Sequence, residues 1–235
     1  QGDESVSVEI LRLCARLTRS EGERARLRAL LGETRDWGGF LRSALDEGIA
    51  MLAYRALKEI EAGEVEAGFG HGSGPTRDLL RRCYYESTAR YLRLRQALRP
   101  VVEELAGKGF RFAFTKGIRL AEPIYGDFGL RAFCDVDLVA HPRDGAGIED
   151  ALAGMGFKVE GAERGAERGT ERAARTEGGL AHSPHYRKGD LLIEVHYDAL
   201  GLQIPLAAPE EIWDGVGSVD LGGLALPVMS LEHEL

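Results

Sequence analysis

The chain has few cysteines, and their spacing suits neither cross-linking nor zinc binding. Its three cysteines, Cys14, Cys83 and Cys134, are odd in number, lie far apart and form no Cys-x-x-Cys pair. Disulfide scaffolds and structural zinc sites need closer, repeated cysteine spacings. We therefore expect reduced thiols and a protein of the cytoplasm.

Long apolar runs are also missing. No stretch approaches the roughly 20 consecutive apolar residues that a membrane-spanning helix needs, and residues 1–10 are polar and acidic, unlike a secretory signal. These two absences predict a soluble chain with no membrane partner.

An excess of basic residues is absent as well. The chain has 30 Lys and Arg against 38 Asp and Glu, which gives a net charge of −8. A protein that coats nucleic acid needs a basic face, so we expect no broad RNA- or DNA-binding surface. The apolar share of 44% is that of an ordinary globular protein, so the composition allows a buried core.

Two kinds of periodicity divide the chain. Apolar residues recur every three to four positions over 37–60 and again over 80–105, which predicts helices. After residue 109, strand-like segments such as "FRFAFT" and "FCDVDLVA" alternate with helical ones, and "HYRKGDLLIEVHY" predicts a hairpin about Gly189-Asp190. We expect an α/β (α+β) fold, with a helical N-terminal region over 1–108 and an α/β region over 109–229.

Two segments depart from this pattern. Residues 161–179, "GAERGAERGTERAARTEGG", have almost no apolar side chains, so we predict a flexible low-complexity insertion. Ser230 is a suitable N-cap residue, and residues 230–235 are expected to begin a C-terminal helix that is truncated.

Acidic residues interrupt two of the apolar strand segments. Asp135 and Asp137 lie in "RAFCDVDLV", and residues two apart in a strand share a face about 6–7 Å from one another. Like charges this close favour a cation between them. In "LLIEVHY", Glu194 and His196 share a face in the same way. If the two strands are neighbours, Asp135, Asp137 and Glu194 form a three-carboxylate site for two Mg²⁺ (or Mn²⁺) ions.

Basic residues lie upstream of the acids. Lys116 and Gly117 fall at a predicted strand-to-helix junction, where a lysine charge and free backbone N–H groups suit a phosphate. Arg131 can meet a phosphate or brace the carboxylates. For His196 the sequence favours a hydrogen-bonded structural role, and His185 is given no chemistry.

These motifs together carry a resemblance to a known family. "TKGIRLAEPIYGDFGLRAFCDVDLV" and "LLIEVHYDAL", over about residues 110–200, resemble the bacterial nucleotidyltransferase-like proteins of the polymerase-β superfamily. The resemblance implies a nucleotidyltransferase palm with a mixed sheet over 109–229. It implies catalytic and metal-binding roles for Asp135, Asp137 and Glu194, and triphosphate binding by Lys116, Gly117 and Arg131.

One departure from that superfamily affects the predicted activity. Its members usually have Gly-Gly or Gly-Ser ahead of the acid pair with a shorter gap, whereas here Lys-Gly occupies that place, eighteen positions before Asp135. This difference affects the predicted contacts with the triphosphate more than the predicted binding of metal.

Three functions remain open. The first is an enzyme that transfers a nucleoside monophosphate from an NTP to an unidentified acceptor (a small molecule, a protein or an RNA end) and releases pyrophosphate. The second is a catalytically weak or inactive nucleotide-binding partner in a biosynthetic or toxin–antitoxin system. A metal-dependent glycosyltransferase ranks last, because helices rather than a nucleotide-binding βαβ unit precede the acid pair.

Overall fold

The structure is a computed structural model that describes residues 2–62, 73–121, 123–160, 184–197 and 213–230. The chain forms two compact units. The first comprises Gln1–Tyr91 and Ile124–Ala132, and the second comprises Leu92–Pro123 and Phe133–Leu235.

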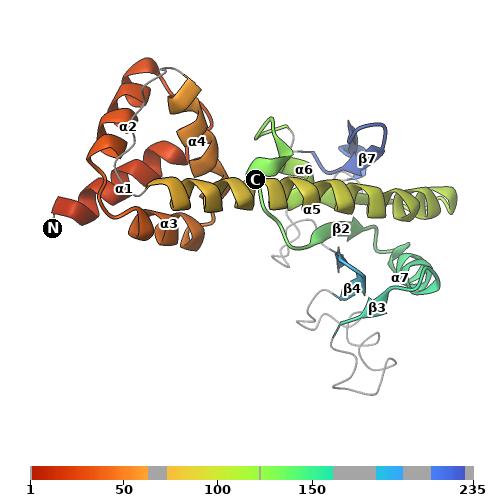
Figure 1. Cartoon of the computed structure of the whole chain (residues 1–235). Helices are drawn as coiled ribbons and strands as arrows, with labels where there is room; N and C mark the ends of the chain where they lie inside the picture. Colours follow the sequence, from red (N-terminus) through yellow and green to blue (C-terminus); the bar gives the residue numbers. More distant parts are fainter. Residues whose placement is uncertain (1, 63–72, 122, 161–183, 198–212, 231–235) are drawn as a thin grey trace. The chain divides into compact units, whose positions relative to one another are not determined.

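The first unit is helical (Figure 1). Its elements are α1 (Gly2–Cys14), α2 (Glu21–Glu33), α3 (Trp37–Asp46), α4 (Ala50–Ala62), the 3₁₀ helix η1 (Phe128–Leu130) and the first half of α5 (Ser73–Gly107). The two units divide within α5, whereas the sequence placed the boundary between residues 108 and 109.

Local sequence explains where two of these helices begin. Ser20 accepts a hydrogen bond from the Glu23 N–H, and the Glu23 carboxylate accepts one from the Ser20 N–H, so the two residues form a capping box at the start of α2. The Asp36 carboxylate caps α3 by accepting from the Gly39 N–H at 2.8 Å. Each cap satisfies backbone donors that the helix itself leaves unpaired.

Apolar side chains from all six elements fill the core of the first unit. Leu27, Phe40, Leu57 and Ile60 are each at most 2% exposed, and the η1 residue Leu130 packs with them. Complete burial of one such side chain is worth roughly 1.5–3 kcal/mol. These contacts explain why the segment Ile124–Ala132 belongs to the helical unit and not to the unit that contains the sheet.

A buried arginine closes the end of α1. The Arg19 side chain is fully buried, and its guanidinium donates to the carbonyls of Leu13 at 2.8 Å and Cys14 at 2.7 Å. It also pairs with Glu59 of α4 at 2.7 Å. Arg19 thus satisfies carbonyls that have no partner inside α1 and links that helix to α4.

The second unit is built on a mixed sheet. Within the described residues the sheet has seven strands in the order β3-β4-β5-β2-β1-β7-β6. The strands are β1 (Phe112–Thr115), β2 (Val136–Ala140), β3 (Lys158–Val159), β4 (His185–Lys188), β5 (Leu191–His196), β6 (Gly217–Asp220) and β7 (Ala225–Val228). The helices of this unit are α6 (Lys116–Ala121), α7 (Gly145–Gly154) and the second half of α5.

The two central strands, β2 and β5, run parallel, and α7, β3 and β4 lie between them in sequence. The β4–β5 hairpin turns at Gly189, whose φ of 57° is in the left-handed region that favours glycine. Along β5, Ile193 and Val195 are buried and Glu194 is half-buried, as alternation predicts.

The predicted fold class is confirmed, as are the hairpin at Gly189-Asp190 and the helix over residues 80–105, which lies within α5. The β6–β7 hairpin was not predicted. The segments 161–179 and 231–235 lie outside the described residues. None of the helices that the structure describes is both long and apolar enough to cross a membrane.

The role of Arg19 predicts a stability change. We expect Arg19→Met to lower the free energy of unfolding of the first unit by roughly 3 kcal/mol, because it removes a buried charge partner and leaves helix-end carbonyls unsatisfied. Urea unfolding followed by far-UV circular dichroism measures the change. Arg26→Met is the matched control, since the Arg26–Glu9 pair is exposed and should contribute little. Equal losses in both variants would contradict the assignment.

Candidate metal and nucleotide site

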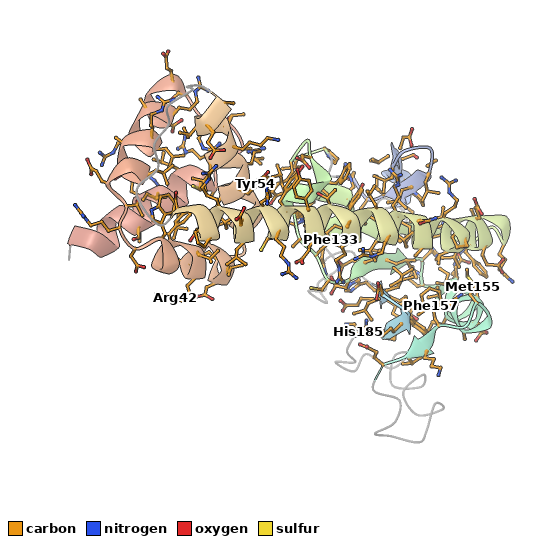
Figure 2. The ribbon with its side chains drawn as sticks, in the orientation of Figure 1. Arg42, Tyr54, Phe133, Met155, Phe157 and His185 are labelled. Atoms are coloured by element: carbon orange, nitrogen blue, oxygen red, sulfur yellow. The ribbon has the colours of Figure 1, made fainter. Side chains whose placement is uncertain are left out.

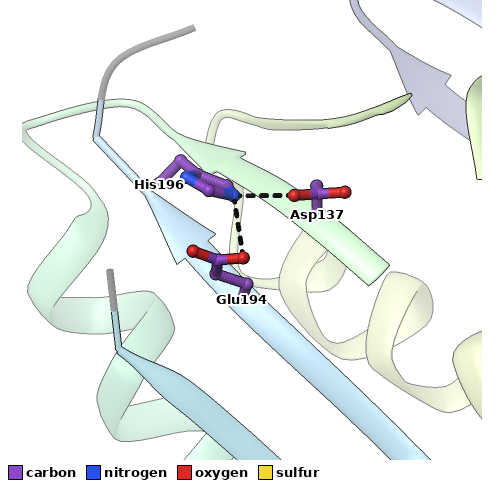
Figure 3. A group of neighbouring side chains, drawn as sticks. All are labelled: Asp137, Glu194 and His196. Carbon is purple, nitrogen blue, oxygen red and sulfur yellow. Dashed lines mark hydrogen bonds and ion pairs between the residues drawn. The ribbon is translucent and has the colours of Figure 1, made fainter. Parts of the chain in front are cut away.

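The acid-bearing strands lie side by side at the centre of the sheet. Strands β2 and β5 pair in parallel, and their register places Asp137 directly beside Glu194. Paired residues of adjacent strands point to the same face, so both carboxylates share one face. His196 follows two residues along β5, and Figure 3 shows the three side chains together.

Asp137 is buried, and its Oδ1 atom has two basic partners. The residue is only 5% exposed. Lys116 Nζ donates to Oδ1 at 2.7 Å, and His196 Nε2 lies 2.9 Å from the same oxygen. Short hydrogen bonds with a charged group of this kind compensate for removing a carboxylate from water.

The same contacts set the ionisation of Asp137. Burial raises the pKa of its carboxyl, but the hydrogen bonds from His196 and Lys116 and their positive charges outweigh burial, so the pKa lies below the ordinary range. Asp137 is therefore anionic at neutral pH, as a metal ligand must be.

The group of possible ligands fits a divalent cation. One oxygen each from Asp137 and Glu194 and one ring nitrogen of His196 lie within 4.8 Å of one another. Two ligands of one Mg²⁺ ion, each about 2.1 Å from it, are at most about 4.2 Å apart. Small side-chain movements would thus close the group around an ion.

Asp135 does not belong to this group. The prediction that Asp135 and Asp137 share a face assumed a strand over both, but β2 begins at Val136 and Asp135 precedes it as a half-buried residue. The structure brings Asp137 and Glu194 together, and the participation of Asp135 stays a prediction.

Glu194 lies between two imidazoles. Its Oε2 atom is 3.6 Å from His196 Nε2 and 3.7 Å from Nε2 of His185. His185 (labelled in Figure 2) pairs directly across from Glu194 on β4. This face of the sheet therefore carries two carboxylates and two histidines.

Lys116 reaches Asp137 from a backbone conformation that is unusual for lysine. It is the only non-glycine residue in the described ranges with a positive φ, 51°, and it lies where β1 meets α6. Strand β1 pairs antiparallel with β2, and Thr115 lies opposite Asp137. The left-handed conformation costs roughly 1–2 kcal/mol, and such strain is concentrated at functional sites. The Lys116 side chain is 53% exposed, so its ammonium remains open to solvent and to a ligand.

Gly117 has a packing role. A Cβ atom at this position would lie 2.9 Å from both Cβ and Cγ of Phe133 (labelled in Figure 2). The absence of a side chain thus lets the start of α6 approach the segment that leads into β2. The prediction that Gly117 faces a phosphate is a separate matter and stays a prediction.

Arg131 belongs to the first unit. Its Nη1 atom lies 3.4 Å from the Tyr125 hydroxyl, and its guanidinium carbon lies 5.8 Å from the centre of that ring. Nearby, Asp127 caps η1 and accepts a hydrogen bond from the Tyr84 hydroxyl at 2.7 Å. The nucleotide-binding role of Arg131 stays a prediction.

The structure agrees with the hydrogen-bonded role predicted for His196, which contacts Asp137 at 2.9 Å. It adds that His196 and His185 both lie beside Glu194. The Glu-x-His spacing in β5 placed His196 on the carboxylate face, and this signal was available. The position of His185 beside Glu194 could not be predicted without the register of the β4–β5 hairpin.

A separate cavity of about 520 Å³ lies in the second unit. Its lining is mainly apolar and includes Val102, Phe110, Trp213 and Pro227, with Arg111 as a charged member. The described residues of the lining include no carboxylate, so they offer no ligands of the kind that Asp137 and Glu194 provide.

Comparison with known proteins identifies a family. A family model described as uncharacterised nucleotidyltransferase matches residues 33–235. No curated protein matches the chain.

The conformation of Lys116 predicts an unusual order of stability. We expect Lys116→Gly to have a free energy of unfolding about 1 kcal/mol higher than Lys116→Met. Both variants lose the contact with Asp137, but only glycine relieves the left-handed backbone. Urea unfolding at pH 7 measures the difference. The same pair of substitutions at Lys158, in strand β3, should give the reverse order, since glycine weakens an ordinary strand. A Lys116→Gly variant that is less stable than Lys116→Met would show that the backbone at position 116 is not strained.

The lowered pKa of Asp137 predicts how stability depends on pH. A depressed pKa contributes stability that is present above the ordinary value of about 3.9 and is lost as pH falls through the folded-state pKa. The stability difference between the wild type and Asp137→Asn should therefore shrink on acidification below about pH 4. Urea unfolding at a series of pH values tests this, with Asp190→Asn in the exposed hairpin turn as control. A difference that grows on acidification would show that burial dominates instead.

Proposed function

This chain belongs to the uncharacterised nucleotidyltransferase family, and we propose on that basis that it transfers a nucleoside monophosphate from an NTP to an acceptor and releases pyrophosphate. The observation that carries the proposal is the pairing of Asp137 with Glu194 on one face of the sheet, with Lys116 bound to Asp137. Because NTPs are available in the cytoplasm, we propose that the reaction takes place there.

We assign the metal ligands from the acidic residues. Asp137 and Glu194 would hold Mg²⁺ or Mn²⁺, and Asp135 would complete a two-ion site by a local movement of the segment before β2. Bound divalent ions supply positive charge that activates an attacking oxygen and stabilises the leaving pyrophosphate. Asp137 is suited to this role because its partners keep it ionised despite burial.

Lys116 is proposed to bind the triphosphate. Its ammonium now contacts the Asp137 oxygen that a metal ion would also use. Once released from Asp137, the half-exposed side chain can place its charge on a phosphate oxygen. Gly117 is proposed to contribute a further contact to the triphosphate.

One observation favours a second candidate, a nucleotide-binding partner with weak or no activity. Asp135 lies outside the ligand group, and Lys116 already contacts Asp137. A site with two carboxylates and a lysine can bind a nucleotide without assembling two ions. The two candidates differ in whether pyrophosphate is released.

Activity is tested by incubation with each labelled NTP, Mg²⁺ or Mn²⁺, and acceptors of three classes: small hydroxyl compounds, proteins and RNA ends. We expect pyrophosphate release that Asp137→Asn and Glu194→Gln each reduce at least about 100-fold, since even outer partners of metal ligands contribute 10- to 100-fold. Asp190→Asn, in the β4–β5 turn, is the matched control and should retain full activity.

A negative result also discriminates between the candidates. If NTPs bind but no acceptor yields pyrophosphate, the chain is a nucleotide-binding partner and the transferase proposal is wrong. If Asp137→Asn keeps wild-type activity, the assigned site is wrong.

A further inference from the structure

We infer that His196 is a metal ligand, so that Asp137, Glu194 and His196 form a mixed carboxylate–imidazole site that prefers first-row transition ions such as Mn²⁺ and Co²⁺ over Mg²⁺. The inference deepens the proposed function and rests on it to the extent that a divalent ion binds this face. It gives a chemical role to a residue that the three-carboxylate hypothesis leaves out.

The orientation of the imidazole is the first support. His196 Nε2 is the atom turned toward the acids, 2.9 Å from Asp137 Oδ1 and 3.6 Å from Glu194 Oε2 (Figure 3). An ion that binds both carboxylate oxygens is thus also within reach of this nitrogen. Metal binding would leave the ring proton on Nδ1, the usual arrangement for a ligating neutral imidazole.

The rigidity of the imidazole is the second support. His196 is 8% exposed and comes from the strand that also carries Glu194, beside the strand that carries Asp137. Three ligands on two paired strands have their spacing fixed by the sheet ladder. Asp135, in contrast, lies outside any strand and outside the ligand group.

The choice of ion follows from the donor atoms. Mg²⁺ favours oxygen ligands in a near-octahedral shell and keeps several waters. A nitrogen donor raises affinity for first-row transition ions, and affinity should increase from Mn²⁺ to Co²⁺. A site with one imidazole and two carboxylates therefore discriminates against Mg²⁺ more strongly than a site with three carboxylates.

The decisive measurement is pulsed electron paramagnetic resonance of Mn²⁺ added to the full chain, without nucleotide. A histidine ligand gives coupling between the Mn²⁺ electron spin and an imidazole ¹⁴N nucleus, which a purely structural histidine does not give. We expect this coupling in the wild type, its retention in His185→Gln and its loss in His196→Gln. His185 is the matched control because it also lies near Glu194 but is not in the ligand group.

Affinities provide a second measurement. Titration with Mn²⁺, Co²⁺ and Mg²⁺ should show Mn²⁺ and Co²⁺ binding weakened at least about 10-fold by His196→Gln, with a smaller change for Mg²⁺, so that the preference for transition ions falls. His185→Gln should leave the preference for transition ions unchanged, because it alters a neighbour of Glu194 and removes no nitrogen ligand. Unfolding curves establish that each variant is folded, and the wild-type ¹⁴N coupling tests the inference even if a variant is not.

The possible outcomes separate this inference from the proposed function. Bound Mn²⁺ without ¹⁴N coupling, or coupling lost in His185→Gln instead, overturns the assignment of His196 whether or not the protein transfers nucleotides. Coupling that depends on His196 supports the assignment even if no NTP is consumed. Failure of the wild type to bind any of the three ions overturns it as well.

Discussion

The burial of one carboxylate constrains much of the second unit. Asp137 lies on a central strand with almost no access to water, directly beside Glu194. An uncompensated buried charge costs several kcal/mol, and a neighbouring carboxylate adds repulsion. The contacts from Lys116 and His196 to one Asp137 oxygen counter both effects. The central strands can carry an acid because three separate segments converge on it.

That convergence is a property of the sheet topology. Antiparallel pairing of β1 with β2 places the end of β1 at the level of Asp137, so Lys116 arrives immediately after the strand. Parallel pairing of β2 with β5 brings Glu194 and His196 to the same level. A parallel neighbour requires a long connection, here made through α7, β3 and β4. The left-handed backbone at Lys116 turns the chain into α6 at this point.

Sequence patterns predicted the parts of this arrangement that depend on local periodicity. Alternation in β5 correctly placed Glu194 and His196 on one face, and Gly189-Asp190 correctly marked a turn. Local sequence does not specify which strands are neighbours. The contacts of His185 with Glu194 and of Lys116 with Asp137 therefore could not be predicted without the register of each strand pair. The β6–β7 hairpin was missed because its strands are four residues each and contain only two β-branched residues, Val219 and Val228.

The contacts that stabilise Asp137 also determine how a ligand could use it. An ammonium 2.7 Å from Oδ1 and a metal ion on that oxygen carry charges of the same sign, so they repel at that distance. Metal entry and departure of Lys116 are therefore coupled in the proposed enzyme, and by linkage the coupling is reciprocal. A phosphate that attracts Lys116 favours the metal, and a metal that displaces Lys116 favours the phosphate. In the proposed enzyme, the interaction that stabilises the buried acid in the free protein would thus make the binding of metal and triphosphate cooperative.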